Sequence, residues 1–265
     1  DAKNNRLSRF ISEYGFIGYP AYTNMQKYIP ANEMDTASSV FKFRDAYPGI
    51  QNTIRNFINR YYPQPNNLRE FIYISGIMQA EAMRVSNEIY RRNMPFCMGA
   101  LLWQYNDVWP VASWSMVDYY GQWKPIMYRT KESFAPIILS SEQKKDSIYI
   151  YYVNDEPENY NCKLYLNVQD FSGEKIWTAQ KPIKIKKNAS QMICSESVTN
   201  ITDDDPLNNL FIQLSLQNGK EEMATKLHYF KRCKNLNLTD AKLWYKITTQ
   251  SQNTIIEIKA NALLK

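Results

Sequence analysis

Residues 96–103 read FCMGALLW, an unbroken apolar run that stands between a helical pattern and a loop. An apolar run of this length in this position is typical of a parallel strand that is buried on both faces. We therefore expect a buried β-strand over residues 96–103, either at the end of an α/β barrel or within an open α/β sheet.

Two helices are predicted upstream of this run, because apolar residues recur there three and four positions apart. Pro63 ends the first stripe, which consists of Ile50, Ile54, Phe57, Ile58 and Tyr61. The second stripe follows the turn-forming residues 65–67 and consists of Phe71, Ile74, Met78, Ala82, Val85 and Ile89. A shorter run, residues 9–12, ends at Glu13 and is expected to be an earlier strand.

Downstream of Pro136 the apolar period changes to two residues, which is typical of strands with one buried face. Turn signals at residues 155–157, 172–173 and 218–219 separate the alternating segments. Roughly seven short strands in about 95 residues predict an immunoglobulin-like β-sandwich. The alternating positions are Ile148, Ile150, Tyr152, Leu164, Leu166, Val168, Ile183, Ile185, Leu210, Ile212, Leu214 and Leu216.

A hairpin is predicted near the end of the chain, from residues 243–247 and 254–258. Two strands cannot bury a core of their own. Residues 234–265 are therefore interpreted as the start of a further β domain that this chain does not complete.

The composition excludes several classes of protein. The 265 residues suffice for one large domain or two ordinary ones. Hydrophobic residues make up 44% and charged residues 22% of the chain, which excludes a disordered tail and a membrane protein. The net charge of +6 is modest, and no long Lys/Arg block occurs, so a nucleic-acid or membrane partner has no support. Because the first residue is Asp1, we expect the chain to be cut from a longer protein.

Carboxylates are the groups left to carry any chemistry. Cys97, Cys162, Cys194 and Cys233 lie too far apart for the close pairs of zinc or redox sites, so buried thiols and no metal or cofactor are expected. A Cys162–Cys194 bridge stays open for an oxidising compartment. His228, the one histidine of the sequence, stands in an alternating run, where a structural role is expected.

Glu13 and Trp103 each stand where a predicted strand ends. Side chains at the carboxyl ends of barrel strands converge on the active site, so Glu13 is a candidate catalytic carboxylate; the alternative is a loop residue that caps a neighbouring backbone. Four tryptophans fall within 21 residues, and indole rings suit the flat faces of sugars. For two of them, Trp114 and Trp123, packing between domains is the favoured alternative.

Four ordered blocks of the sequence resemble the β-mannosidases of glycoside hydrolase family 2. They are residues 9–16 (RFISEYGF), 79–84 (QAEAMR), 103–115 (WQYNDVWPVASWS) and 118–124 (DYYGQWK). The resemblance implies that residues 1–136 are the C-terminal part of a (β/α)8 TIM barrel, strands 7 and 8, and that residues 137–233 are the immunoglobulin-like domain. It also implies that Glu13 is the catalytic nucleophile and that Trp103 lines the mannose-binding subsite.

The sequence departs from the family pattern in two places. The family usually continues the first block with Gln-Ser-Phe-Pro, where this chain has residues 17–20, IGYP. The family's acid/base glutamate, in an Asn-Glu pair, has no match; Asn32–Glu33 lies downstream in a loop and receives no role. The chain by itself is therefore expected to be inactive.

The resemblance implies the C-terminal portion of a retaining exo-β-mannosidase, which removes terminal non-reducing β-D-mannose from oligosaccharides or glycans. Its remaining partner is the rest of its own barrel, upstream of Asp1. The alternatives are another family 2 glycosidase, such as an exo-β-glucosaminidase or endo-β-mannosidase, and a non-catalytic carbohydrate-binding or packing fragment. Asn106–Asp107 favours the mannosidase, since glucosaminidases have Asn-Asn there. An extracytoplasmic location is expected, in the bacterial periplasm, or in lysosomes for a eukaryotic source.

Overall fold

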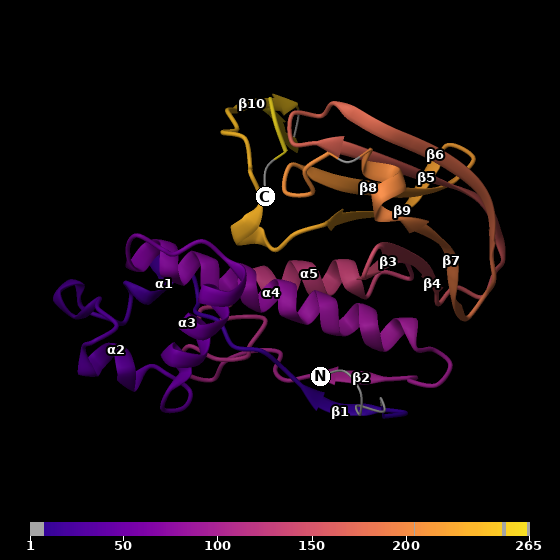
Figure 1. The fold of residues 1–265 in the computed structure, drawn as a ribbon. Helices are drawn as coiled ribbons and strands as arrows, with labels where there is room; N and C mark the ends of the chain where they lie inside the picture. The colour runs from indigo at the N-terminus through magenta and orange to yellow at the C-terminus, as the bar shows by residue number, and fades with distance from the viewer. Residues whose placement is uncertain (1–7, 204, 251–252, 264–265) are drawn as a thin grey trace. The chain divides into compact units, whose positions relative to one another are not determined.

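The computed structural model describes residues 8–203, 205–250 and 253–263, drawn in Figure 1. The chain divides into two compact units. The first unit holds the described residues up to Ile138 together with Tyr152–Glu158 and Lys186–Gln191. The second unit holds Leu139–Tyr151, Asn159–Ile185 and the described residues from Met192 onward.

The first unit contains a pair of short parallel strands and the helices that accompany them. Strand β1 (Ile11–Tyr14) pairs with β2 (Ala100–Leu102), with Tyr14 opposite Leu102. The intervening chain forms the short helices α1 (Tyr22–Met25), η1 (Ala31–Glu33) and α2 (Ser39–Phe43) and the long helices α3 (Ile50–Tyr61) and α4 (Leu68–Arg92). Helix α5 (Pro125–Ser133) follows β2 after a long loop.

Both predicted helices are confirmed, and their ends have local causes. Helix α3 starts after Gly49, whose φ of +90° suits glycine, and ends before Pro63. At the start of α4, the Asn67 side chain accepts a hydrogen bond from the Glu70 backbone N–H at 2.9 Å. The Glu70 carboxylate accepts in return from the Asn66 N–H at 2.8 Å, which is close to a capping box.

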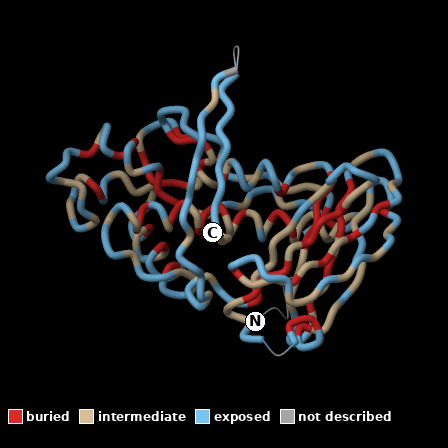
Figure 2. The backbone as a smooth tube through the Cα atoms, turned by 90° about the horizontal axis from the view of Figure 1, so that it is seen from above, coloured by how far each residue is buried: buried red, intermediate tan, exposed pale blue. Residues whose placement is uncertain are grey.

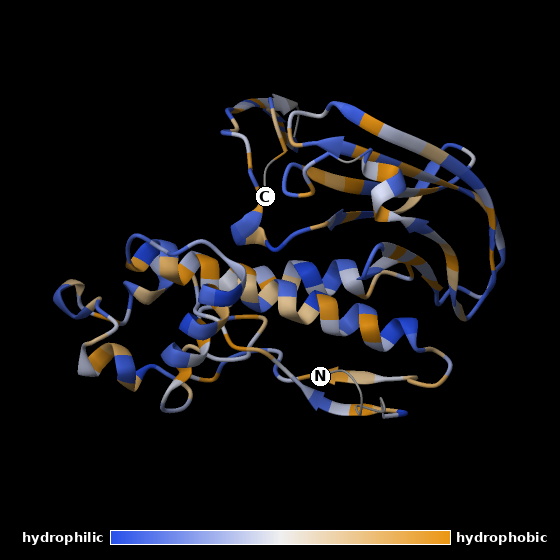
Figure 3. Cartoon of the chain, in the orientation of Figure 1, coloured by the Kyte–Doolittle hydropathy of each residue, from blue (hydrophilic) through white to orange (hydrophobic). Residues whose placement is uncertain are grey.

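Helix α4 organises the core of the first unit. Its amphipathic pattern is visible as alternating hydrophobic and hydrophilic bands in Figure 3. One part of the helix contributes Phe71, Ile72 and Met78 to a cluster that also includes Ile50, Ile54 and Ile58 of α3. Farther along, Ala80 and Met83 pack with Ile126 of α5, and this second cluster contacts Tyr14 and Leu102 of the strand pair.

The predicted strand over residues 96–103 is wrong in length and in burial. Strand β2 spans Ala100–Leu102, and Leu101 is 56% exposed. Leu102 packs against the cluster of α4 and α5, so the helices cover one face of the strand. Among the described residues, no element covers the other face, where Leu101 is exposed. An apolar run indicates that both faces of a strand have to be buried. The residues that bury them belong to other segments, so the run itself does not show whether they are present.

The immunoglobulin-like sandwich is confirmed by the order and pairing of strands β3 to β9. One sheet has the strand order β3-β4-β7, made of Ile137–Lys144, Ser147–Asn154 and Ala189–Ser197. The other has the order β6-β5-β8-β9, made of Lys175–Ile185, Tyr160–Asp170, Leu210–Asn218 and Glu221–Tyr229. The short helices α6 (Val198–Thr202) and η2 (Cys233–Asn235) accompany these strands.

The predicted period of two is what builds this sandwich. In β5 and β8 every second residue is fully buried, and buried residues recur along these strands in Figure 2. Leu164 lies opposite Leu216 and Leu166 lies opposite Leu214, so the buried side chains of neighbouring strands share one face of the sheet. The fully buried residues are Leu164, Leu166, Val168, Ile212, Leu214 and Leu216.

The predicted hairpin is present as β10 (Leu243–Gln250) and β11 (Asn253–Ala260). Tyr245 lies opposite Ile258, and Ile247 lies opposite Ile256, so one face of the ribbon is apolar. This face is exposed, with Ile258 62% accessible, and the ribbon is pale blue in Figure 2. That the hairpin opens a further domain stays a prediction, as do the domain limits 1–136, 137–233 and 234–265.

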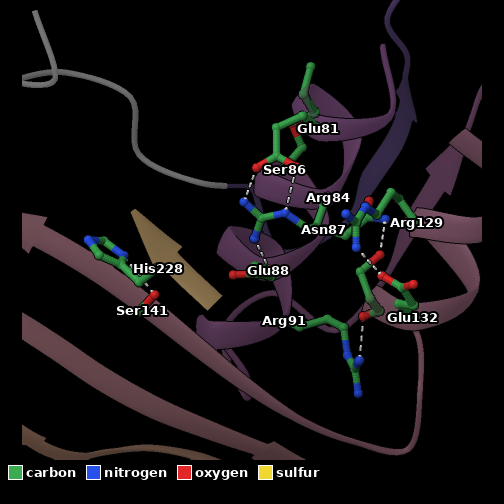
Figure 4. Close-up of polar contacts among 12 residues, drawn as sticks. Glu81, Arg84, Ser86, Asn87, Glu88, Arg91, Arg129, Glu132, Ser141 and His228 are labelled. Carbon is green, nitrogen blue, oxygen red and sulfur yellow. Dashed lines mark hydrogen bonds and ion pairs between the residues drawn. The ribbon is translucent and has the colours of Figure 1, made fainter. Parts of the chain in front are cut away.

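The cysteines form no disulfides in the described residues, and the histidine lies close to a serine hydroxyl. None of the four cysteines forms a disulfide within the described part of the chain, so the Cys162–Cys194 bridge is not formed in this structure. The Cys162 sulfur lies 3.7 Å from the Met223 sulfur instead. His228 stands on β9, and its Nδ1 atom lies 2.9 Å from the Ser141 hydroxyl, as Figure 4 shows.

Candidate active site

Glu13 and Trp103 lie at the carboxyl ends of adjacent parallel strands. Tyr14 and Leu102, their immediate neighbours in sequence, pack against the α4–α5 cluster. Glu13 lies where the register of the strand pair shifts, between Ile11 and Tyr14, and Trp103 directly follows β2. Both are exposed, Trp103 to 48%. The structure therefore brings the two predicted site residues to the same end of the strand pair.

The strand that carries Glu13 is fixed to the helices by Tyr14. The Tyr14 hydroxyl donates a hydrogen bond of 2.5 Å to the Asn87 side chain of α4. The Asn87 amide donates onward to the Ser133 hydroxyl of α5 at 2.7 Å. Burial raises the pKa of Tyr14, and nearby Tyr90 raises it further, so the phenol stays neutral and can donate. These bonds restrain the backbone directly beside Glu13.

The ends of the two strands are in very close contact at Gly15. The Trp103 backbone N–H donates a hydrogen bond of 2.8 Å to the Tyr14 carbonyl oxygen. A Cβ atom at position 15 would lie 2.3 Å from the Trp103 carbonyl oxygen, far inside contact distance. Glycine is therefore required here by the approach of the two backbones, which holds Glu13 and Trp103 together.

The loop after Trp103 is built around a buried carboxylate that sequence reasoning did not assign. Asp107 accepts hydrogen bonds of 2.6 Å from each of the Ser113 and Ser115 hydroxyls. It also accepts from the Gln104 side chain at 3.2 Å. With 4% of its surface exposed, Asp107 has its oxygens directed into the loop rather than toward solvent. The signal in the sequence that could have identified Asp107 was its position within the block 103–115.

A second buried carboxylate, Asp118, shapes the tight turn that follows. One of its oxygens accepts from the Tyr120 and Gln122 backbone N–H groups, each at 2.9 Å. The other accepts from the Asn24 side chain of α1 at 2.5 Å. Asp118 thus joins the turn to the loop that follows β1.

The four clustered tryptophans have different surroundings. Trp103, Trp109 and Trp123 are exposed, as a sugar-facing surface requires. Trp123 contacts Tyr128 edge to face, with ring centroids 5.3 Å apart. Trp114 instead stacks on Tyr47 at 5.7 Å and packs against the main cluster of the first unit. Its role is in packing, within this unit.

The block 79–84 serves structure on α4. Gln79 points inward, whereas Arg84 forms ion pairs with Glu81 and Glu88, shown in Figure 4. Burial lowers the pKa of Arg84, but the two carboxylates outweigh this and raise it overall, so the group stays charged. Glu33, from the Asn32–Glu33 pair, stands in η1, away from the strand ends.

The described residues contain neither a metal-binding cluster nor a helix that could span a membrane. No group of three or more His, Cys, Asp or Glu side chains there could hold a metal ion. None of the helices in the described ranges is both long and apolar enough to cross a bilayer.

Comparisons with known proteins find β-mannosidases. Residues 146–235 match the family described as Mannosidase Ig/CBM-like domain. The β-mannosidase of Capra hircus is 26% identical over 276 residues, which cover 97% of this chain and 31% of that protein. The crystal structure of the β-D-mannosidase from Dictyoglomus thermophilum superposes with a TM-score of 0.87 at 27% identity, covering 96% of this chain and 31% of that one. The chain is a homologue of the β-mannosidases of glycoside hydrolase family 2.

The β-mannosidase B of Thermothelomyces thermophilus shows the strongest local identity of these three relatives. It is 34% identical over 143 residues, which cover 49% of this chain and 16% of that protein. The chain spans about a third of the length of the β-mannosidases that it matches almost throughout. Homology to β-mannosidases therefore extends over both units, although each relative is much longer.

Substitution of Gly15 tests the close approach of the strand ends. We expect Gly15→Ala to break the Trp103 N–H to Tyr14 bond, because the added Cβ cannot share space with the Trp103 carbonyl. Amide exchange of a peptide containing Trp103 should accelerate, and the melting temperature should fall by several degrees, since about 1 kcal/mol shifts it by about 2–4 °C in a large domain. Ser12→Ala, at an exposed position of the same strand, is the control. Unchanged exchange in Gly15→Ala would contradict the assignment.

Proposed function

We propose that this chain is part of a retaining exo-β-mannosidase that hydrolyses terminal, non-reducing β-D-mannose residues. The observation that carries the proposal is the pair Glu13 and Trp103, which lie at adjoining strand ends and are both exposed. A carboxylate beside an exposed indole combines a nucleophile with a surface for the apolar face of a sugar. The homology to β-mannosidases is the reason for proposing mannose as the sugar.

The proposed barrel rests on the geometry of the first unit. We assign β1 and β2 to strands 7 and 8 of a (β/α)8 barrel, with α4 and α5 on its outer side. The parallel pairing, the helices packed on one face and the exposed apolar Leu101 on the other support this assignment. The remaining strands would cover the exposed face and are proposed to lie upstream of Asp1.

In this mechanism the Glu13 side chain attacks the anomeric carbon and forms a glycosyl-enzyme. A second carboxyl group, about 5–5.5 Å away, protonates the departing oxygen and then activates water for the second displacement. We assign no residue of this chain to that role. The exposed face of Trp103 would hold the sugar ring so that its anomeric carbon meets the Glu13 carboxylate.

The closest alternative is another family 2 glycosidase, such as an exo-β-glucosaminidase or an endo-β-mannosidase. Asn106–Asp107 favours a mannosidase by sequence, but the Asp107 carboxylate is buried and bonded to two serine hydroxyls. Any effect of Asp107 on sugar preference would act through the shape of the loop. The exposed apolar face of β2 equally suits a non-catalytic packing fragment, which activity measurements separate from the enzyme.

The proposed partners are a β-mannoside oligosaccharide or glycan and the rest of the same barrel. We propose no nucleic-acid or membrane partner and an extracytoplasmic location, periplasmic for a bacterial source. The triplets at Asn188, Asn200 and Asn237 are compatible with a lysosomal or secreted enzyme if the source is eukaryotic.

Glu13→Ala in the complete enzyme tests the nucleophile. Turnover of an aryl β-mannoside should fall by several orders of magnitude, because the covalent route disappears. A mechanism-based fluoro-mannoside should label the peptide that contains Glu13. Glu33→Ala, which removes a carboxylate away from the strand ends, should retain activity. Labelling of Glu33 or Asp107 would overturn the assignment.

Trp103→Ala in the complete enzyme tests the sugar platform. Loss of the indole should weaken productive binding of mannose by about 1 kcal/mol or more, in line with specific aromatic contacts plus lost burial. Steady-state kinetics with an aryl β-mannoside measures this effect, and Trp114→Phe, at a packing position, serves as the comparison. Wild-type kinetics in a folded Trp103→Ala enzyme would reduce Trp103 to a packing residue.

The 265-residue chain, produced alone, should show no measurable β-mannosidase activity, because its cleft is open and its acid/base is missing. The unpaired strand edges and exposed apolar face should make residues 1–136 self-associate or unfold. The sandwich up to about Cys233 should stay protected in hydrogen exchange, because its core is closed. Activity near that of a complete glycosidase would place the acid/base within this chain.

A further inference from the structure

The carbonyl oxygen of Ser113 is a meeting point of three donors among the described residues. The Gly18 backbone N–H donates to it at 3.1 Å, the Gln79 side chain at 3.2 Å and the Lys124 ammonium at 3.1 Å. These donors come from the loop after β1, from helix α4 and from the residue before α5. One backbone carbonyl in the loop after Trp103 is therefore held from three directions.

Lys124 makes the link between the two loops direct. Its ammonium also donates to the Gly18 carbonyl oxygen at 2.9 Å, so it bridges Gly18 and Ser113. The side chain is buried, with 2% of its surface exposed. Burial lowers the pKa of Lys124 to about 8, although the Asp107 and Asp118 carboxylates act in the opposite direction. Burying a lysine charge is unfavourable unless hydrogen bonds and opposite charges compensate for the lost hydration.

The same network reaches both proposed site residues. On one side, Gln79 also donates to the Phe16 carbonyl at 2.8 Å, three residues after Glu13. On the other side, the Ser113 hydroxyl and the Gln104 side chain both donate to Asp107, and Gln104 directly follows Trp103. Buried and partly buried hydrogen bonds thus connect the loop after Glu13 to the loop after Trp103.

The loop after β1 is tightly packed at Gly18. A Cβ atom at Gly18 would lie 2.7 Å from the Gln79 side-chain oxygen and 3.0 Å from the Ser75 carbonyl oxygen. The chain at Gly18 is consequently pressed against α4, where Lys124 and Ser113 hold it from the opposite loop.

We infer that Lys124 is a positioning residue that clamps the loop after Glu13 to the loop after Trp103 and so sets the orientation of the carboxylate toward the sugar. The orientation part of this inference rests on the proposed function. Lys124 is not expected to touch the substrate, because its ammonium is engaged with two backbone carbonyls inside the protein.

The test compares variants of the complete enzyme. Lys124→Met removes the charge and the hydrogen bonds at similar length, whereas Lys124→Arg keeps a charge that does not titrate in the accessible range. Lys131→Met removes an exposed lysine from α5 and is the matched control. Each variant is measured by kinetics on an aryl β-mannoside as a function of pH and by hydrogen exchange of peptides covering residues 15–20 and 111–116.

We expect Lys124→Met to lower kcat about tenfold to a hundredfold with KM changed little, as for a misplaced catalytic group. Exchange in both peptides should accelerate about tenfold in the same variant, since closed hydrogen bonds protect amides. The wild-type rate should decline above about pH 8, where Lys124 loses its proton despite the nearby charges of Asp107 and Asp118. Lys124→Arg should move that decline to higher pH, and Lys131→Met should match the wild type.

Each arm can overturn the inference by itself. Unchanged hydrogen exchange in folded Lys124→Met would show that Lys124 does not hold the two loops together, whatever the kinetics. Accelerated exchange with wild-type kcat and an unchanged pH profile would leave Lys124 as a structural residue without a positioning role. If the wild-type enzyme hydrolyses no aryl β-mannoside, the proposed function fails, and the exchange arm alone decides whether the clamp exists.

Discussion

The hydrogen bond from the Trp103 backbone N–H to the Tyr14 carbonyl oxygen, 2.8 Å long, is the contact on which the site depends. It joins the ends of two parallel strands whose residues are almost ninety positions apart, and the absence of a side chain at Gly15 makes it possible. Glu13 and Trp103 are neighbours in space because of this bond. Either residue alone would be an ordinary exposed side chain.

Helix α4 supports this contact from behind with both apolar and polar side chains. Ala80 and Met83 pack toward Tyr14 and Leu102, and Asn87 binds the Tyr14 hydroxyl. Gln79 reaches the loops beyond the strands. Buried amides need hydrogen-bond partners. Asn87 uses both its oxygen and its NH2 group, and the NH2 group of Gln79 donates to two carbonyl oxygens, while the Gln79 side-chain oxygen has no partner among the described residues.

The second unit follows a different principle. Its strands are stabilised by alternation, so that Leu164, Leu214 and their neighbours form one closed apolar layer. The hairpin β10–β11 has the same alternation, with Tyr245, Ile247, Ile256 and Ile258 on one face, but that face is exposed. Alternation predicts which face needs cover, and neighbouring chain segments decide whether the cover is there.

The sequence by itself determined the local elements and the identity of the proposed site residues. Helices α3 and α4, the alternating strands of the sandwich and the last hairpin depend on short-range periodicity, which any stretch of ten to fifteen residues displays. Glu13 and Trp103 were identified because they end strands within blocks that resemble family 2 β-mannosidases, a likeness that the comparisons confirm for the chain as a whole.

The tertiary structure alone decided what happens between distant segments. The apolar run at residues 96–103 predicted a strand with two covered faces, but the structure covers one, because packing partners are not encoded in the run itself. The bridge from Lys124 to Gly18 and the requirement for Gly15 arise from residues far apart in sequence, whereas Asp107 is buried because its own loop folds onto it through Ser113 and Ser115. Charge and hydropathy assign Asp107 and Lys124 to the surface; their hydrogen-bond partners, supplied by the fold, allow them to be buried.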